Sequence, residues 1–146
     1  MAFQFDSFDR PFAAAIDRLR SVSLRPTRQR LVICRQLFDA GDRHVTAETL
    51  HAELVGQRLR VSLATVYNTL HQFTKAGLLR EVVVDGAKTY FDTNISAHHH
   101  FFDIERGDLI DIPGEGIAVN GLPTAPDGLE IDRVDVVIRI RRAARG

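Results

Sequence analysis

The fold that we expect for this chain is decided by residues 61–79, VSLATVYNTLHQFTKAGLL. This stretch has the pattern of a helix with both ends marked. Ser62 is a good N-cap, because its hydroxyl can accept a hydrogen bond from a free N–H of the first turn. Gly77 suits the position after the last turn, because glycine adopts the left-handed conformation without steric cost. Apolar residues recur between them at helical spacing and predict one buried stripe, formed by Leu63, Val66, Leu70 and Phe73.

The opposite face of the same helix predicts contact with DNA. It is small and polar, with one aromatic side chain and no acidic one, and consists of Ala64, Thr65, Tyr67, Asn68, His71 and Gln72. Such a face can enter the major groove, where Asn and Gln pair with adenine and a Thr or Tyr can touch thymine methyl groups. An ordinary amphipathic surface helix is the alternative interpretation.

A β-hairpin is predicted directly after this helix. Residues 80–84 and 88–92 are rich in β-formers and flank Asp85-Gly86, a typical hairpin turn. Earlier in the chain, helical patterns cover about 11–22, 28–40 and 47–57, with a turn expected at residues 42–45. Helices followed by a recognition helix and a hairpin predict a winged helix-turn-helix, so we expect residues 1–92 to form a DNA-binding domain.

The second half of the chain has a different pattern. A second hairpin is predicted within residues 101–112, a short helix within 114–128 and a long closing strand at 129–141. A small sheet of this kind usually needs a partner surface. The predicted fold class is therefore α+β: an N-terminal winged helix-turn-helix followed by a small α/β dimerisation domain with a three-stranded antiparallel sheet. We expect residues 93–146 to pair in a homodimer and to sense a ligand.

The charge distribution supports two roles. The 146 residues have a net charge of zero, yet residues 1–80 hold 12 Lys and Arg against 7 Asp and Glu, and residues 81–146 hold 7 against 12. A basic half and an acidic half favour phosphate contact and cation binding respectively, although chance segregation of solvated charges is an alternative. We expect the following residues to contact DNA: Arg25, Arg28, Arg30, Arg58, Arg60, Ser62, Ala64, Thr65, Tyr67 and Asn68.

Composition also limits the class of protein. Cys34 is the one cysteine, which excludes an intrachain disulfide and a Cys-x-x-Cys zinc site. The N-terminus lacks the basic start and apolar core of a signal peptide. No apolar run approaches the length needed to span a membrane. We therefore expect a cytoplasmic protein with no membrane partner.

A histidine run, His98-His99-His100, is the second informative stretch. Residues two apart share a face of a strand, so His98 and His100 are expected to point together and His99 away. Two imidazoles at this spacing can chelate one metal ion, and His44 and Asp92 could complete a nitrogen and oxygen site. The alternative is three solvated histidines in a linker.

The sequence resembles the ferric-uptake-regulator (Fur) family. The resemblance is carried by four blocks in order: residues 24–31, 44–50, 61–67, and the histidine run with Gly107. It implies a homodimer that binds AT-rich inverted repeats in double-stranded DNA and regulates metal genes. Carried over by position, Tyr67 matches a base-contacting tyrosine and Arg25 a basic residue of the minor groove. The inter-domain metal ligands of the family fall on His44, Asp92, His98 and His100, with Asp92 in place of the usual Glu.

Several positions depart from the family pattern. The common His-His-Asp-His run is Ala97-His98-His99-His100 here, the first Cys-x-x-Cys pair falls on Asp103 and Arg106, and a later histidine falls on Arg133. The resemblance therefore predicts no structural four-cysteine zinc site. These departures, with Tyr67-Asn68-Thr69-Leu70, resemble the iron-response-regulator (Irr) branch. That branch implies a response to haem through His98, His99 and His100, without the Cys-Pro haem motif, because Arg35 follows Cys34.

Three functions follow from these patterns. The leading one is a transcriptional regulator, mainly a repressor, of iron and haem homeostasis genes that responds to haem or iron. The second is a divalent-metal sensor for iron, manganese or zinc, with His44, Asp92, His98 and His100 as ligands. The third is a metalloenzyme. We expect no enzyme, because no nucleophile has a plausible base and no His-Glu-x-x-His motif occurs.

Overall fold

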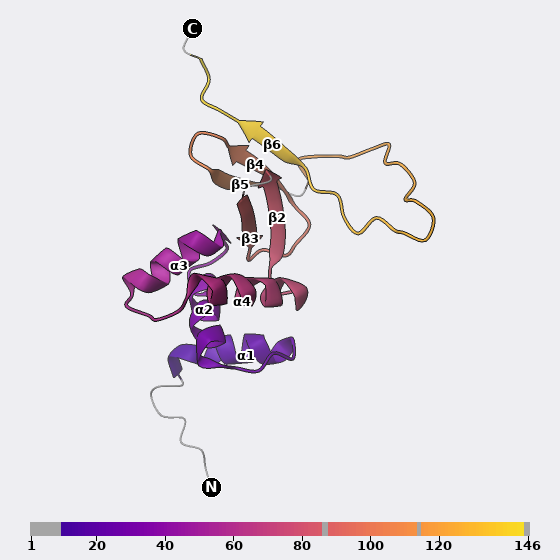
Figure 1. Cartoon of the computed structure of the whole chain (residues 1–146). Coiled ribbons are helices and arrows are strands. Elements are labelled where there is room, and N and C mark those ends of the chain that lie inside the picture. The colour runs from indigo at the N-terminus through magenta and orange to yellow at the C-terminus, as the bar shows by residue number, and fades with distance from the viewer. Residues whose placement is uncertain (1–9, 86–87, 114, 145–146) are drawn as a thin grey trace. The chain divides into compact units, whose positions relative to one another are not determined.

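The chain divides into two compact units, Met1–Ile95 and Ser96–Gly146. The computed structural model describes residues 10–85, 88–113 and 115–144, with the elements labelled in Figure 1. The division lies three residues beyond the boundary predicted between residues 92 and 93. The predicted turn residues Gly86 and Ala87 lie outside the described residues.

The first unit consists of helices and a three-stranded sheet. Its helices are η1 (Arg10–Phe12), α1 (Ala13–Ser21), α2 (Arg28–Phe38), α3 (Ala47–Gly56) and α4 (Leu63–Lys75), and its strands are β1 (His44–Val45), β2 (Arg80–Asp85) and β3 (Lys88–Asp92). The strand order is β1-β3-β2, with antiparallel pairing throughout. Residues 42–45 were expected to form a turn, and for His44 and Val45 this was wrong. His44 and Val45 pair with β3 instead, because the hairpin of β2 and β3 leaves one edge of β3 open to a partner strand.

The helix boundaries follow the capping residues. Hydroxyl groups of Thr27, Thr46 and Ser62 accept backbone N–H groups three residues on, at 3.3, 3.1 and 3.1 Å. Gly77 follows α4 with φ +90°, and the N–H of Leu78 donates to the carbonyl of Phe73 at 2.9 Å. Both predicted ends of α4 are therefore confirmed, and α4 starts directly after a connection of residues 57–62 from α3.

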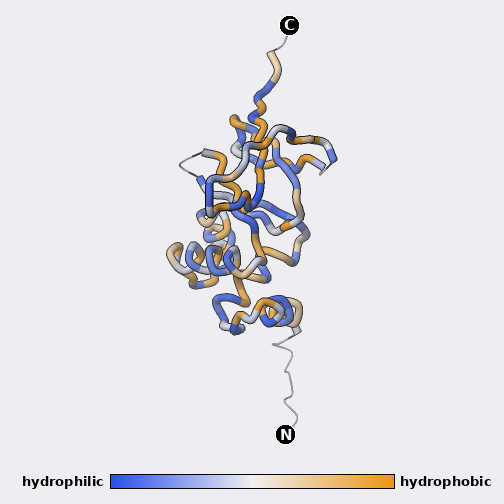
Figure 2. The backbone as a smooth tube through the Cα atoms, turned by 90° about the vertical axis from the view of Figure 1, so that its right-hand side faces the viewer, coloured by the Kyte–Doolittle hydropathy of each residue, from blue (hydrophilic) through white to orange (hydrophobic). Residues whose placement is uncertain are grey.

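Amphipathic helices build the core of the first unit. Blue and orange alternate along the helical turns in Figure 2, as expected when one side of each helix is apolar. The fully buried side chains include Leu19, Ile33, Leu37, Leu50, Leu54, Val66, Leu70, Phe73 and Phe91. Leu63 was predicted to join this stripe and does not, because its side chain is 41% exposed. Ser62 and Ala64 beside it are exposed too, so the first turn of α4 projects beyond the core.

The second unit is a three-stranded sheet, formed by β4 (His99–Asp103), β5 (Asp108–Ile112) and β6 (Val137–Ile140) in the order β5-β4-β6. The predicted α+β class and strand number are confirmed, but the sheet is mixed, because β6 runs parallel to β4. A parallel neighbour needs a long crossover connection, which residues 113–136 provide. Residues 115–128 of this connection contain no helix, contrary to the prediction. Its glycines and prolines explain the difference, because both residue types disfavour a helix interior.

Within the part of the chain that the structure describes, the helices are all too short or too polar to cross a membrane.

Candidate functional site

The solvent-facing side of α4 is the first candidate site. Ser62, Ala64, Tyr67 and Asn68 are exposed, and Thr65 is half-buried. Thr65 also shares a hydrogen bond with Ser62, at 2.9 Å between their hydroxyl oxygens, so it contributes to the start of the helix. Residues 54–80 contain no Asp or Glu. A surface without carboxylates can approach a polyanion without like-charge repulsion.

Tyr67 is held in place by a second ring. His71, one turn further along α4, packs edge to face against Tyr67 with 4.6 Å between the ring centroids. The other side of His71 packs against the buried Phe91 of β3, at 5.5 Å and again edge to face. His71 was predicted to lie on the polar face of the helix, but its packing against Tyr67 was not predicted. The spacing of four residues was the available signal, because such residues are neighbours on a helix.

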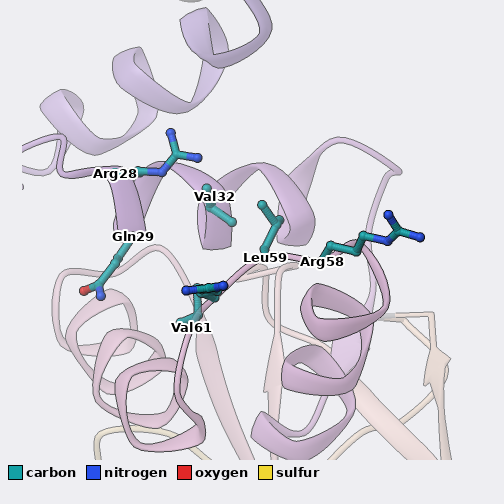
Figure 3. A pocket seen from close by; sticks show the side chains of 7 residues that line it. Arg28, Gln29, Val32, Arg58, Leu59 and Val61 are labelled. Carbon is teal, nitrogen blue, oxygen red and sulfur yellow. The ribbon is translucent and has the colours of Figure 1, made fainter.

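Three arginines surround a hollow beside α4. It has a volume of about 390 Å³, and its lining residues are Arg28, Gln29, Val32, Arg58, Leu59, Arg60 and Val61. In Figure 3, Arg28 and Arg58 stand on either side of Val32 and Leu59. Guanidinium groups at the rim of an apolar floor match the charge and hydrogen-bonding needs of a phosphodiester. The structure thus brings together three of the five arginines that are predicted to contact DNA.

The two remaining arginines lie near the start of α2. Arg25 is exposed, whereas Arg30 is engaged with the protein: its guanidinium donates to the carbonyl of Arg25 and to Oε1 of Gln72, both at 3.0 Å. Arg30 therefore fixes the connector that carries Arg25 against α4. Its contact with Gln72 was not foreseen, because the two residues are far apart in sequence.

The first unit supplies two candidate metal ligands. His44 and Asp92 are register partners in β1 and β3, with 3.2 Å between Nε2 of His44 and Oδ2 of Asp92. The Asp92 side chain is buried, and its Oδ1 accepts the N–H of Asn94 at 2.9 Å. Arg43 anchors this corner through a bidentate ion pair with Glu53 of α3, at 2.8 and 2.6 Å.

The second unit supplies three more candidate metal ligands. Nε2 of His98 and Nε2 of His100 lie 3.4 and 3.3 Å from the same oxygen, Oδ1 of Asp111. Both imidazoles are buried, and their ring centroids are 4.5 Å apart. The predicted common orientation of His98 and His100 is therefore confirmed. Asp111 was not among the predicted ligands; it is opposite His100 in the β4–β5 register.

The hydrogen bond of His98 assigns its tautomer. Nδ1 of His98 lies 2.6 Å from the carbonyl oxygen of Ser96, and a carbonyl can only accept, so Nδ1 carries the proton. In the neutral ring, the lone pair of Nε2 then faces the Asp111 carboxylate. A neutral imidazole nitrogen and a carboxylate oxygen that face each other form a donor set that suits iron, manganese or zinc.

His99 differs from both neighbours. Its Nδ1 accepts the N–H of Val136 at 3.0 Å, so the neutral ring carries its proton on Nε2. This tautomer has no free lone pair for a metal or a haem iron. The structure therefore separates His99 from the pair formed by His98 and His100.

The family's first cysteine pair falls on two residues with a different role. Oδ1 of Asp103 accepts the N–H groups of Glu105 and Arg106, at 3.0 and 3.1 Å, and Oδ2 pairs with Arg142 at 2.8 Å. The Arg106 N–H, the Glu105 N–H and Arg142 hold the pKa of Asp103 below its usual value. In place of a cysteine pair, this part of the second unit therefore holds a turn that is hydrogen-bonded to Asp103 and an ion pair between Asp103 and Arg142. Cys34 is buried in the first unit, and burial raises the pKa of its thiol to about 11.

Comparisons with known proteins agree with this architecture. The model of the ferric uptake regulator family matches residues 21–138. The chain is 32% identical to the ferric uptake regulation protein of Shigella flexneri over 115 residues, 77% of this chain and 78% of that protein. It is 30% identical to a peroxide-responsive repressor of Staphylococcus epidermidis over 111 residues, 76% and 73% of the two chains.

Solved structures extend the likeness to three dimensions. The ferric uptake regulator of Pseudomonas aeruginosa with manganese gives a TM-score of 0.66 at 26% identity, covering 89% of this chain and 98% of that one. The Vibrio cholerae ferric uptake regulator gives a TM-score of 0.67 at 21% identity, covering 87% and 98%. The winged helix-turn-helix, the small second sheet and the family match lead to one conclusion: the chain belongs to the ferric uptake regulator family.

Proposed function

We propose that this chain is a homodimeric transcriptional repressor that binds an AT-rich inverted repeat and responds to a divalent metal ion: iron, manganese or zinc. The observation that carries the proposal is the carboxylate-free face of α4 beside a hollow lined by Arg28, Arg58 and Arg60. Exposed Tyr67 and Asn68 supply aromatic and amide groups for base edges. The arginines supply phosphate contacts that set the register on the duplex.

The proposed dimer uses the second unit. Ile110, Phe101 and Ile138 are register partners across β5, β4 and β6, so their side chains form one apolar row. Ile110 is 48% exposed and Ile138 is 39% exposed. A second copy of the chain would bury this row, and twofold symmetry would present two copies of α4 to the half-sites of an inverted repeat.

The proposed metal ligands come from both units. His44 and Asp92 are two donors and His98, His100 and Asp111 are three, whereas protein sites for these metals take four to six. Neither group alone supplies four protein ligands. Asp92 and His98 are six residues apart, so the connecting chain spans at most about 20 Å. We propose that one ion recruits both groups and thereby fixes the angle between the units, which raises affinity for DNA.

Haem is the second candidate ligand, and the iron-response-regulator resemblance is its main support. In that version the chain regulates iron and haem homeostasis genes, one or two of His98, His99 and His100 ligate haem iron, and occupancy lowers DNA affinity. The Val136 hydrogen bond of His99 favours the divalent-metal version, because axial ligation through Nε2 would require the other tautomer. A metalloenzyme has no supporting observation among the described residues.

Fluorescence anisotropy with a labelled AT-rich inverted repeat tests these assignments. We expect the wild-type protein to prefer this duplex to a GC-rich duplex of equal length and to bind it more tightly with Mn²⁺, Zn²⁺ or anaerobic Fe²⁺. His98→Ala/His100→Ala should lose the metal response and keep basal DNA binding, whereas His99→Ala should keep both. A response to haem with a Soret band, lost in the triple histidine variant, would instead support the haem version. Equal binding to both duplexes would contradict the DNA-binding assignment.

A further inference from the structure

Arg80 is a buried arginine next to a proposed metal ligand. It begins β2, its side chain is only 7% exposed, and its register partner is Asp92 of β3. Asp92 also pairs in register with His44, because β3 is the central strand of the β1-β3-β2 sheet. Directly opposed residues project from the same face, with Cβ atoms about 5 Å apart. Asp92 therefore has His44 as its register partner on one side and Arg80 on the other.

The guanidinium of Arg80 and a bound divalent ion would compete for the negative charge of the Asp92 carboxylate. Arginine stays protonated at every pH at which proteins fold, so its positive charge is permanent. Buried charges require compensation, and the Asp92 carboxylate, 1% exposed, is opposite Arg80 in the register. Any cation that ligates Asp92 would meet this fixed charge at short range, where screening by solvent is weak.

We propose that Arg80 is an internal counter-ion of Asp92 that weakens divalent-metal binding and so sets the metal concentration at which the protein responds. This inference rests on the proposed function. Arg80 is not a metal ligand, since guanidinium has no acceptor. It acts through Asp92: it stabilises the metal-free arrangement and opposes the metal-bound one. The effect is one of charge, so it should apply to Zn²⁺ and Mn²⁺ alike, although these ions differ in preferred geometry.

Metal titration of charge-altering variants provides the first test. Arg80→Met removes the charge and keeps an unbranched stem, Arg80→Gln removes the charge and keeps hydrogen-bond donors, and Arg80→Lys keeps the charge as the matched control. Affinities of the full-length chain for Zn²⁺ and Mn²⁺ are measured by competition with a chromophoric chelator. We expect tighter binding in the two neutral variants, by about tenfold or more, and wild-type affinity in Arg80→Lys. Unchanged or weaker binding by a folded neutral variant, while the wild type binds metal, would overturn the inference.

Thermal unfolding without metal provides the second test. A double-mutant cycle combines Arg80→Gln with Asp92→Asn. We expect Arg80→Gln to lower the Tm when Asp92 is present and to lower it less, or raise it, in the Asp92→Asn background, where that carboxylate is gone. Additive effects of the two changes would overturn the counter-ion role. Failure of every variant, wild type included, to bind either metal would contradict the proposed metal response itself, whatever the cycle shows.

Discussion

Tyr67 and His71 pack edge to face on α4, one turn apart, and His71 also packs against Phe91 of the sheet. The exposed ring of Tyr67 is thus connected to the buried core by a chain of three rings. This contact restricts the side chain of Tyr67, which we propose as a DNA contact, in the free protein. Restricting a contact residue in advance lowers the entropy that binding must remove.

His71→Ala should weaken DNA binding without unfolding the protein. An edge-to-face pair contributes about 0.5–1.5 kcal/mol, so the expected loss of affinity is about two- to tenfold. Anisotropy titrations at fixed salt measure it. The control, His71→Phe, keeps a ring and should retain most of the affinity. If His71→Ala binds like the wild type while Tyr67→Ala does not, Tyr67 needs no support from His71.

Arg58→Gly should weaken DNA binding while it stabilises the fold. Arg58 has φ +60°, a conformation that is strained for arginine and free for glycine. The variant should therefore gain up to about 1 kcal/mol in free energy of unfolding. It should also lose one phosphate contact, which reduces the slope of log affinity against log salt by about one. Arg20→Ala, at an exposed position of α1, is the matched control and should keep the full slope. An unchanged slope in Arg58→Gly would show that Arg58 does not contact a DNA phosphate.

Ile110→Glu/Ile138→Glu should convert the proposed dimer into a folded monomer. The two positions flank Phe101 in the apolar row, and both are exposed within one chain, so the new charges face solvent in the monomer and a like charge in the dimer. Sedimentation velocity at micromolar concentration distinguishes the two states. Leu122→Glu places the same charge on an exposed leucine outside the sheet and should leave the dimer intact. A dimeric double variant would exclude the row as the interface.

Glu53→Gln should reveal a pH-dependent stabilisation of the corner that carries His44. Hydrogen bonding from Arg43 is the main cause that lowers the pKa of Glu53 from 4.5. The ionised form is therefore favoured in the folded protein, and its contribution is present above pH 4.5 and lost as the pH falls through the lowered pKa. At pH 7 the variant should be less stable by about 1 kcal/mol, since the pair is partly exposed.

Urea unfolding at a series of pH values checks this dependence. The difference between the wild type and Glu53→Gln should shrink in acid. Glu48→Gln, an exposed glutamate of the same helix, is the control and should show a smaller difference at every pH. A constant difference for Glu53→Gln would mean that its ionisation is not linked to folding.

Local chemistry explains what the sequence determined by itself. Ser62, Thr46 and Thr27 mark helix starts, and Gly77 marks a helix end, because caps depend on groups only a few residues away. The common orientation of His98 and His100 was likewise predicted from the two-residue repeat of extended backbone, although β4 begins only at His99. These features were predictable because each requires only neighbouring residues.

Pairing between distant segments required the tertiary structure. Asp111 joins His98 and His100 through the β4–β5 register, and Arg80 lies opposite Asp92 through the β2–β3 register. A shift of one residue in either hairpin would move these side chains to the other face, and the sequence pattern does not fix the register that closely. The parallel addition of β6 likewise depends on the path of residues 113–136. The sequence determined which residue types were available for a metal and for DNA, whereas tertiary pairing decided which of them face one another, because register is a property of two strands and not of one.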